Sequence, residues 1–495
     1  MFKAHILLIL YNMAEFANIE TRLFINGEFT PSIRGKTFKL INPATDKSTA
    51  EIYEGGAEDV DLAVQSAKNA FPAWAEAEAS DRQCILQKLA DLVEQHAAQF
   101  AYLDAISMGK PLSTYIDHTL AVATIRYFAG KAYDVHGITS LGSKDHLNIS
   151  LRQPYGVTGA IIPWNVPLVM LAFKVAPALM AGNTMVLKSS ERAPLSPLLF
   201  ARLAKEAGLP PGVLNVLSGF GNPCGDAIAR HMEIRKISFT GSHATGKIVQ
   251  RAAAESNLKV CTLELGGKSP LIVFEDADLE KAAAAAAFSI TFNSGQICMA
   301  CTRVYVHTSV ANRFIERYKA NILKIMGKIG DPLETTTTFG PQADRQQYDN
   351  ISKALQKAAD DGLEFILGGR PLEGKGCFIP PAVVLHPPEQ SDIMKKEIFG
   401  AISCVSTFTN EEDVLDRAND TEYGLYASVF TRDLNRAIRI AKGFEAGAVG
   451  VNTASPYYSQ DLPLGGYKSS GSGRELGQEG LESWTEVKSV YIDLT

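Results

Sequence analysis

The chain has 495 residues, of which 46% are hydrophobic and 21% are charged, and it carries a formal net charge of −6 at pH 7. A chain of this length can bury a large core and is expected to form a globular protein of two or more domains. The acidic balance, without a dense face of Lys and Arg, argues against nucleic acid as a partner and favours small molecules or other proteins.

Residues 1–20 are expected to form a flexible N-terminal leader. Lys3 precedes an apolar run over residues 6–10 that is too short to span a bilayer and is followed by no clear small-residue cleavage site. Met13 is an alternative start, so a leader is favoured over a secretory signal. No other segment is long and apolar enough to span a membrane, so we expect no membrane partner.

Residues 58–135 are expected to be mostly helical. Apolar side chains recur at spacings of three and four over residues 57–75 and 80–108, which predicts two amphipathic helices. Ser80 followed by Asp81 is typical of a helix start.

From Gly156 the pattern changes to short apolar strands that alternate with helices. Strands are expected over residues 157–162, 184–188, 213–217, 236–240 and 260–263. Helices are expected between them, over residues 168–181, 197–207 and 245–254. This alternation predicts an α/β fold in which a parallel sheet is covered by helices on both faces and binds ligands outside the carboxyl ends of its strands.

A second alternating block runs from Pro270 to about Gly466 and is expected to form its own domain. Its strands are expected over residues 271–274, 302–307, 403–408, 427–431 and 448–452. Residues 146–152 and 483–494 also alternate like strands, either as ordinary edge strands or as an arm that pairs across subunits.

The seven cysteines are scattered and odd in number, which is not typical of a disulfide framework. We therefore expect a reducing compartment, the cytoplasm. Cys301 follows Cys298 at the spacing of a zinc or redox pair, but there is no second such pair and no convincing His partner, so no metal site is expected.

Cys298 and Glu264 are candidates for a thiol nucleophile and a carboxylate base. A thiol is partly ionised near neutral pH and attacks carbonyl carbon, and a carboxylate can deprotonate the water that releases a captured acyl group. Taken singly, such a cysteine is more often a small buried hydrophobe and such a glutamate a solvated charge.

Glycine-bearing turns follow several strands of the first block. The stretch with Gly221 and Gly225 has one residue more than a dinucleotide fingerprint and is weak evidence alone. The segment Phe239-Thr240-Gly241-Ser242 ends a strand and opens a helix, which suits either a bound phosphate or a plain capped turn.

Lys188 and Glu191 follow another strand end. Both can hydrogen-bond to the adenosine ribose of a dinucleotide, although a solvated loop pair is the alternative. Because a carboxylate there would repel a 2′-phosphate, the pair favours NAD over NADP.

The turn from Pro163 to Pro167 holds an amide, Asn165, between two prolines. It can be a turn former only. It can also donate an N–H to an oxyanion, with the backbone N–H of Cys298 as the second donor.

Taken together, in their order and spacing, these segments resemble the NAD(P)-dependent aldehyde dehydrogenase superfamily from about Leu23 to the C-terminus. The matching segments are Pro163-Trp164-Asn165, Lys188 with Glu191, Phe239-Thr240-Gly241-Ser242, Glu264-Leu265-Gly266-Gly267-Lys268, Gly295-Gln296-Ile297-Cys298, Glu397-Ile398-Phe399-Gly400 and Gly471-Ser472-Gly473-Arg474-Glu475. The resemblance implies a Rossmann-like NAD-binding domain (21–137 and 156–265), an α/β catalytic domain (266–466) and a β oligomerisation arm (138–155 and 467–495) in a homodimer or homotetramer.

The resemblance also implies a reaction. Cys298 would attack the aldehyde to give a thiohemiacetal held by Asn165 and the Cys298 N–H, hydride would pass to nicotinamide, and water activated by Glu264 would hydrolyse the thioester to an acid. Lys174 and Glu475 occupy positions of supporting polar groups, or serve structure alone.

The remaining positions follow from the same resemblance. The nicotinamide ribose would bind Glu397, with Phe399 near the ring. The cofactor-binding set is Ile161, Pro163, Trp164, Lys188, Glu191, Gly221, Gly225, Phe239, Thr240, Gly241, Ser242, Leu265, Gly266, Glu397 and Phe399. The substrate tunnel would be lined by Val166, Met170, Phe173, Ile297, Tyr457, Tyr458 and Leu464, although Met170 and Phe173 also suit a core.

That mostly apolar lining favours an uncharged aliphatic or aromatic aldehyde. Two departures from the family pattern are Ala401, where proline is common, and Leu464, where an aromatic residue is usual. Two other functions stay open: transfer of the acyl group to coenzyme A, which the carboxylate Glu264 disfavours, and a catalytically silent scaffold, which the intact Cys298 and Asn165 disfavour.

Overall fold

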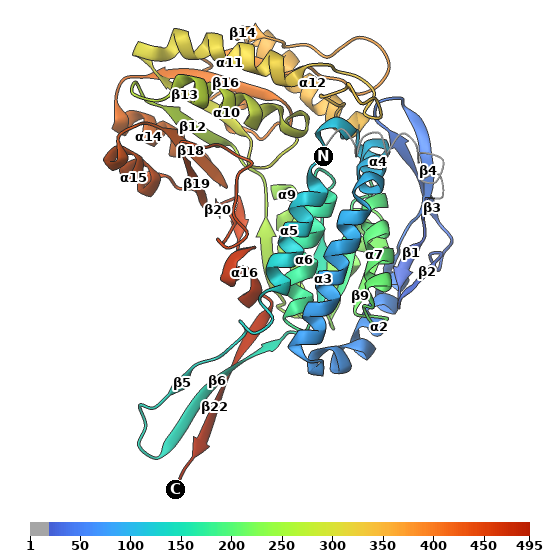
Figure 1. Cartoon of the computed structure of the whole chain (residues 1–495). Helices are drawn as coiled ribbons and strands as arrows, with labels where there is room; N and C mark the ends of the chain where they lie inside the picture. Colours follow the sequence, from blue (N-terminus) through green and yellow to red (C-terminus); the bar gives the residue numbers. More distant parts are fainter. Residues whose placement is uncertain (1–18) are drawn as a thin grey trace.

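The computed structural model describes residues 19–495. The predicted leader, residues 1–20, therefore lies almost entirely outside the described residues. Within them the chain forms two large sheets, each flanked by helices, and a β-stranded arm that projects away from both (Figure 1). The predicted α/β class is confirmed.

The first sheet has eight strands in the order β2-β1-β9-β8-β7-β10-β11-β21. Its five central strands are parallel, as predicted: β7 (Val157–Ile161), β8 (Thr184–Ser189), β9 (Leu214–Ser218), β10 (Lys236–Thr240) and β11 (Val260–Glu264). Every residue of β7 to β10 is buried. Such continuous apolar strands are typical of a parallel sheet covered on both faces.

The register aligns the carboxyl ends of these strands. Ile161 pairs with Lys188 and Phe239, and Thr240 pairs with Glu264. The chain order reverses between β7 and β10, because β8 and β9 extend the sheet to one side and β11 extends it to the other. Parallel sheets bind ligands outside the strand ends at such a reversal, so this edge is where a site is expected.

Helices surround this sheet (Figure 1). They are α2 (Ala57–Glu76), α3 (Ala79–Gln95), α4 (Ala97–Met108), η2 (Leu112–Thr114), α5 (Asp117–Ala129), α6 (Pro167–Met180), α7 (Leu195–Ala207), η3 (Gly221–Gly225), α8 (Asp226–Arg230) and α9 (His243–Glu255).

The prediction of one helix over residues 80–108 is wrong, because the helix breaks at His96. The His96 ring Nδ1 donates to the Leu92 carbonyl oxygen at 2.8 Å and closes α3. Helix α3 has one buried stripe, whereas α4 is buried on nearly all sides. The break lets the apolar α4 enter the core while α3 stays at its surface.

Four strands that the sequence pattern does not predict precede α2. Strands β1 (Leu23–Ile25) and β2 (Glu28–Thr30) extend the first sheet with antiparallel pairing, and β3 (Thr37–Asn42) and β4 (Lys47–Tyr53) form a separate hairpin. With three residues each, β1 and β2 carry too few alternations for a clear period, whereas β3 and β4 are mostly exposed or half-buried and so lack an apolar run.

The second sheet has seven strands in the order β14-β15-β16-β13-β12-β18-β19. The five predicted strands are confirmed as β12 (Ser269–Val273), β13 (Cys301–His307), β16 (Ile402–Phe408), β18 (Tyr426–Phe430) and β19 (Ala448–Val451), all parallel. The structure adds β15 (Ala382–Leu385) and the antiparallel edge strand β14 (Glu364–Leu367). The helices of this block are α10 (Leu279–Thr291), η4 (Phe292–Gly295), η5 (Thr308–Val310), α11 (Ala311–Met326), α12 (Arg345–Asp360), α13 (Asp392–Lys395), α14 (Glu411–Asn419) and α15 (Leu434–Gly443).

The arm consists of β5 (Thr139–Ser140), β6 (His146–Pro154) and β22 (Thr485–Asp493), and the C-terminus lies at its tip (Figure 1). The segment 467–495 is not wholly in this arm. Strand β20 (Tyr467–Lys468) pairs with β17 (Tyr423–Gly424), β21 (Gly471–Ser472) closes the edge of the first sheet, and α16 (Gly477–Glu482) packs against α6. Among residues 19–495, no helix combines the length and apolar character needed to cross a bilayer.

Candidate active site

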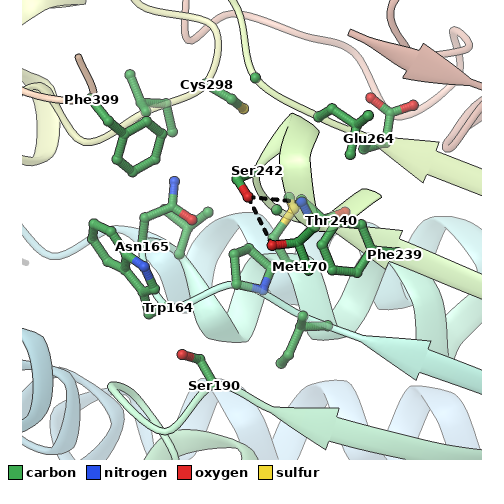
Figure 2. A pocket seen from close by; sticks show the side chains of 18 of the residues that line it. Trp164, Asn165, Met170, Ser190, Phe239, Thr240, Ser242, Glu264, Cys298 and Phe399 are labelled. Atoms are coloured by element: carbon green, nitrogen blue, oxygen red, sulfur yellow. Dashed lines mark hydrogen bonds between the residues drawn. The ribbon is translucent and has the colours of Figure 1, made fainter. Parts of the chain in front are cut away.

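A cavity of about 1190 Å³ lies between the carboxyl edge of the first sheet and the loops of the second. Its wall is built by the ends of β7, β8 and β10, the first turn of α9, the segment after β11, the loop before β13 and residues 396–399. Figure 2 shows side chains of Asn165, Glu264, Cys298 and Phe399 around it.

Nearly all residues predicted from the sequence line this one cavity. These are Asn165, Glu264, Cys298 and Glu475 of the catalytic set, the whole cofactor set, and Val166, Met170, Phe173, Ile297, Tyr458 and Leu464 of the substrate set. Two predicted residues do not line it. Lys174 is fully buried behind the wall, and Tyr457 is 62% exposed on the outer surface.

Cys298 sits in a tight loop between η4 and β13. Asn293, Ser294 and Gly295 all have positive φ, and a Cβ on Gly295 would lie 2.1 Å from the backbone nitrogen of Ala401. Only glycine fits this approach. The loop is thereby packed directly against the segment that carries Phe399.

Buried amides tie the cysteine loop to its neighbours. Gln296 Oε1 accepts from the backbone N–H of Ala343 at 2.9 Å, and Gln296 Nε2 donates to the Asn293 carbonyl at 3.1 Å. Asn165 Nδ2 donates to the Gln296 carbonyl at 3.0 Å. An amide has two N–H donors, so Asn165 retains one for a ligand oxygen beside Cys298.

The Cys298 thiol is held in its neutral form. Burial, first, and the neighbouring carboxyl groups of Glu397 and Glu264 raise its pKa to about 12. Both a low-polarity wall and negative charge oppose a thiolate here. The thiol must lose its proton as it reacts.

Glu264 ends β11 and is buried, with Oε1 lacking a hydrogen-bond partner among the described residues. Burial, first, and the charge of Glu475 raise its pKa well above the usual value, while Lys174 and Arg474 act in the opposite direction. A buried carboxyl group with a free oxygen can take up or release a proton inside the cavity.

Lys174 supports this part of the wall from behind. Its Nζ donates to Glu475 Oε1 at 2.6 Å and to Thr240 Oγ1 at 2.7 Å, and Ser238 Oγ donates to the same Glu475 oxygen at 3.1 Å. These bonds join α6 and β10 to the segment before α16. Lys174 thus acts on the cavity through Glu475.

Glu397 stands where the segment after β11 meets the second block. Its Oε1 accepts from the Gly267 N–H at 3.0 Å, and a Cβ on Gly266 would lie 2.1 Å from Oε2. Burial raises its pKa to about 7, against the lowering effect of the Gly267 bond and Lys268. Beside it, the rings of Trp164 and Phe399 pack edge to face at 5.3 Å.

The first turn of α9 forms the opposite end of the cavity. Ser242 is its N-cap, and its Oγ accepts from the Thr245 N–H at 3.3 Å. The turn is therefore capped, and the remaining unpaired N–H groups of the first turn still favour an anion. Buried Lys188 donates to the Ser189 carbonyl at 2.8 Å, and burial lowers its pKa.

This arrangement fits a dinucleotide. A helix N-terminus suits a pyrophosphate, Lys188 and Glu191 offer partners for one ribose, and the carboxyl group of Glu397 offers them for another. Among residues 19–495, no three His, Cys, Asp or Glu side chains cluster as ligands for a metal ion.

Several lining residues are absent from the sequence prediction. Ser190 and Arg192 flank the predicted Glu191, and Phe292 precedes the predicted cysteine segment, so proximity to the motifs is a usable signal for them. Ile116 lies directly before α5 and Leu120 lies on it. Both are distant in sequence from every motif, and only the packing of α5 against α6 brings them to the cavity.

Comparison with known proteins identifies the family. The family model described as "Aldehyde dehydrogenase family" matches residues 29–490. The chain is 43% identical to retinal dehydrogenase 2 of Gallus gallus over 479 residues, which covers 96% of this chain and 92% of that protein. It is also 43% identical to aldehyde dehydrogenase 1 of Tanacetum cinerariifolium, over 95% of this chain and 94% of that protein.

Solved structures agree over nearly the whole chain. An NAD⁺ complex of an aldehyde dehydrogenase from Bacillus cereus superposes with a TM-score of 0.94 at 41% identity, covering 98% of this chain and 99% of that chain. A mutant indole-3-acetaldehyde dehydrogenase of P. syringae, in complex with NAD⁺ and IAA, superposes with a TM-score of 0.94 at 36% identity, covering 97% and 99%. This chain is a member of the aldehyde dehydrogenase family.

Proposed function

We propose that this protein oxidises an uncharged aliphatic or aromatic aldehyde to the carboxylic acid, with NAD as the hydride acceptor. The observation that carries the proposal is that Cys298, Asn165 and Glu264 line the same cavity as Glu397 and the first turn of α9. A nucleophile, an oxyanion donor, a base and a dinucleotide cradle are the parts that this reaction needs.

Cys298 is the proposed nucleophile. Its sulfur adds to the aldehyde carbon as the thiol proton passes to water in the cavity, and the aldehyde oxygen becomes an oxyanion that accepts hydrogen bonds from Asn165 Nδ2 and the Cys298 N–H. NAD bound in the cavity would accept the hydride that this adduct loses, which leaves a thioester on Cys298. The buried second N–H of Asn165 supports this role, because it needs a partner.

Glu264 is the proposed base for the second half of the reaction. It takes a proton from the water that attacks the thioester, and the acid leaves Cys298. The free Oε1 and the raised pKa of Glu264 support this role, since a base near neutral pH must bind its proton more tightly than an exposed glutamate. A base at this position favours water over coenzyme A as the acyl acceptor.

NAD is the proposed cofactor in preference to NADP. Glu191 lines the cavity after β8, near the expected adenosine ribose, and a carboxylate there repels a 2′-phosphate. The structural relatives solved with NAD⁺ support the same choice. Arg192 Nε lies 3.9 Å from Glu191 Oε1, but it pairs more closely with Asp344, at 2.6 Å.

The proposed substrate is an apolar aldehyde of substantial size. The cavity wall near Phe173 is formed mostly by aliphatic and aromatic side chains, and no Arg or Lys of the described residues stands among them. Relatives named for retinal and indole-3-acetaldehyde support a bulky, uncharged substrate.

The arm is the proposed interface of a homodimer or homotetramer. Exposed Val487, Tyr491 and Ile492 lie on β22, and burial of such side chains against a second copy is favourable.

We further propose that the first sheet and its helices, residues 21–137 and 156–265, form the NAD-binding domain, that residues 266–466 form the catalytic domain, and that the protein works in the cytoplasm.

An aldehyde panel read by NADH absorbance tests the proposal. The unmodified protein should reduce NAD with apolar aldehydes, whereas Cys298→Ala should form no NADH and still bind NAD by calorimetry. Cys84→Ala, which removes an exposed thiol of α3, is the control and should keep full activity. Activity retained in Cys298→Ala would reject Cys298 as the nucleophile.

A further inference from the structure

One polar side chain interrupts the apolar wall of the cavity near Phe173. Ile116, Leu120, Val169, Met170 and Phe173 line this region, together with Tyr458. The Tyr458 ring packs edge to face against Phe173, with centroids 5.4 Å apart. A phenylalanine would make the same ring contact, so the hydroxyl group needs its own explanation.

The Tyr458 hydroxyl is buried and has no hydrogen-bond partner among the described residues. A buried hydroxyl normally pairs with a protein group, because leaving it unpaired costs the hydration that it had in the unfolded chain. Tyr458 lines the cavity, so a molecule inside it can supply the missing partner.

A second buried oxygen without a partner among the described residues belongs to Asp117, whose charge acts on Tyr458. Asp117 is the first residue of α5, directly after Ile116 of the cavity wall, and is fully buried. Its Oδ1 accepts from Lys110 Nζ at 2.6 Å, whereas its Oδ2 has no partner among the described residues. Burial, first, and the charge of Asp117 raise the pKa of Tyr458. Tyr458 therefore keeps its proton, and its hydroxyl can act as a hydrogen-bond donor.

We propose that the Tyr458 hydroxyl is a specificity determinant that donates a hydrogen bond to an uncharged acceptor oxygen, of an ether, ketone or alcohol, carried by the aldehyde substrate away from its reacting carbon. This rests on the proposed oxidation of aldehydes. No Arg or Lys of the described residues lines the cavity near Phe173 to pair with a terminal carboxylate, and the one cation beside Asp117, Lys110, is already paired with it, so the acceptor is neutral.

The unmodified enzyme gives the first test. Straight-chain aldehydes of four to ten carbons are compared with ω-methoxy aldehydes of the same number of chain atoms, whose ether oxygen only accepts. At one chain length the methoxy compound should have a kcat/KM about tenfold above that of its alkyl partner. If the methoxy aldehydes are not preferred at any chain length while the alkyl aldehydes are oxidised, the role of Tyr458 is overturned and the proposed function is not. Failure to oxidise any aldehyde would instead reject the proposed function.

Two variants of neighbouring tyrosines give the second test. Tyr458→Phe should abolish the methoxy preference at that length, because the donor is lost while the ring contact with Phe173 stays. Tyr457→Phe removes a hydroxyl that is on the outer surface and should leave the preference unchanged. An unchanged methoxy-to-alkyl ratio in Tyr458→Phe, or an equal loss in Tyr457→Phe, would contradict the assignment.

Discussion

Lys174 Nζ lies 2.6 Å from Glu475 Oε1, and both side chains are buried, at 0% and 6% exposure. Glu475 lines the cavity and raises the pKa of Glu264, so this ion pair connects a packed helix to the proposed base. A buried pair of this kind is sensitive to loss of either partner, because the remaining charge then stays uncompensated.

Replacement of Glu475 by Gln should therefore destabilise the protein by about 3 to 5 kcal/mol, measured by denaturant unfolding. It should also lower the pKa of Glu264, because one neighbouring negative charge is removed, and shift the pH–rate profile toward acid. Glu479→Gln, an exposed change in α16, is the matched control. A destabilised Glu475→Gln whose profile does not move would limit the pair to a structural role.

Replacement of Glu264 by Gln should separate the two halves of the reaction. Formation of the thioester precedes the step that needs the base, so a burst of NADH should survive while steady turnover falls about 100-fold or more. Rapid mixing with excess NAD measures both phases. An unchanged steady rate would remove Glu264 from the mechanism.

Activity should rise with pH through the neutral range. The pKa of Cys298 is raised to about 12 and that of Glu264 is raised as well, and each group must give up its proton before it can act. Both shifts favour the inactive, protonated forms at low pH. As pH is lowered from 9 to 6, kcat/KM, which reports the reaction of Cys298, and kcat, which includes the hydrolysis by Glu264, should therefore both fall. A pH–rate profile that is flat, or that falls with rising pH, would contradict the raised pKa values of Cys298 and Glu264.

Replacement of Glu191 by Gln should relax the preference for NAD. Removal of the negative charge beside the expected 2′ position should raise kcat/KM for NADP by about tenfold relative to NAD. Glu76→Gln, at the exposed end of α2, serves as the control. If the ratio of the two cofactors does not change, Glu191 does not meet the adenosine ribose.

Replacement of Gly295 by Ala should move the cysteine loop. Its φ is +77°, and a Cβ would lie 2.1 Å from the Ala401 nitrogen, so backbone must shift and activity should fall about 100-fold. Gly362→Ala is a matched control, because its φ is +76° but nothing lies within 4 Å of the new Cβ. It carries the same backbone strain without the clash, so equal losses in both variants would point to strain rather than loop position.

The strands of both central sheets could be predicted because burial on both faces leaves continuous apolar runs between turn residues. The break at His96 could not, since the residues on either side of it are good helix formers and only the core decides which helix enters it. Strands β1 and β2 could not be predicted because they have three residues each, and β3 and β4 could not because they are mostly exposed or half-buried.

Each motif is a short, continuous segment, so sequence alone determined the chemical groups available to this protein. These are a thiol, one amide donor and one backbone donor, a carboxyl base and a phosphate-binding turn. The tertiary structure decided how these groups behave. Burial beside two carboxyl groups keeps the Cys298 thiol protonated, packing places Lys174 behind the wall, and α5 brings Asp117 close to Tyr458 from more than three hundred residues away in the chain. The reason is that side-chain type is a property of the chain, whereas the polarity and partners around each side chain depend on contacts between segments that no local pattern records.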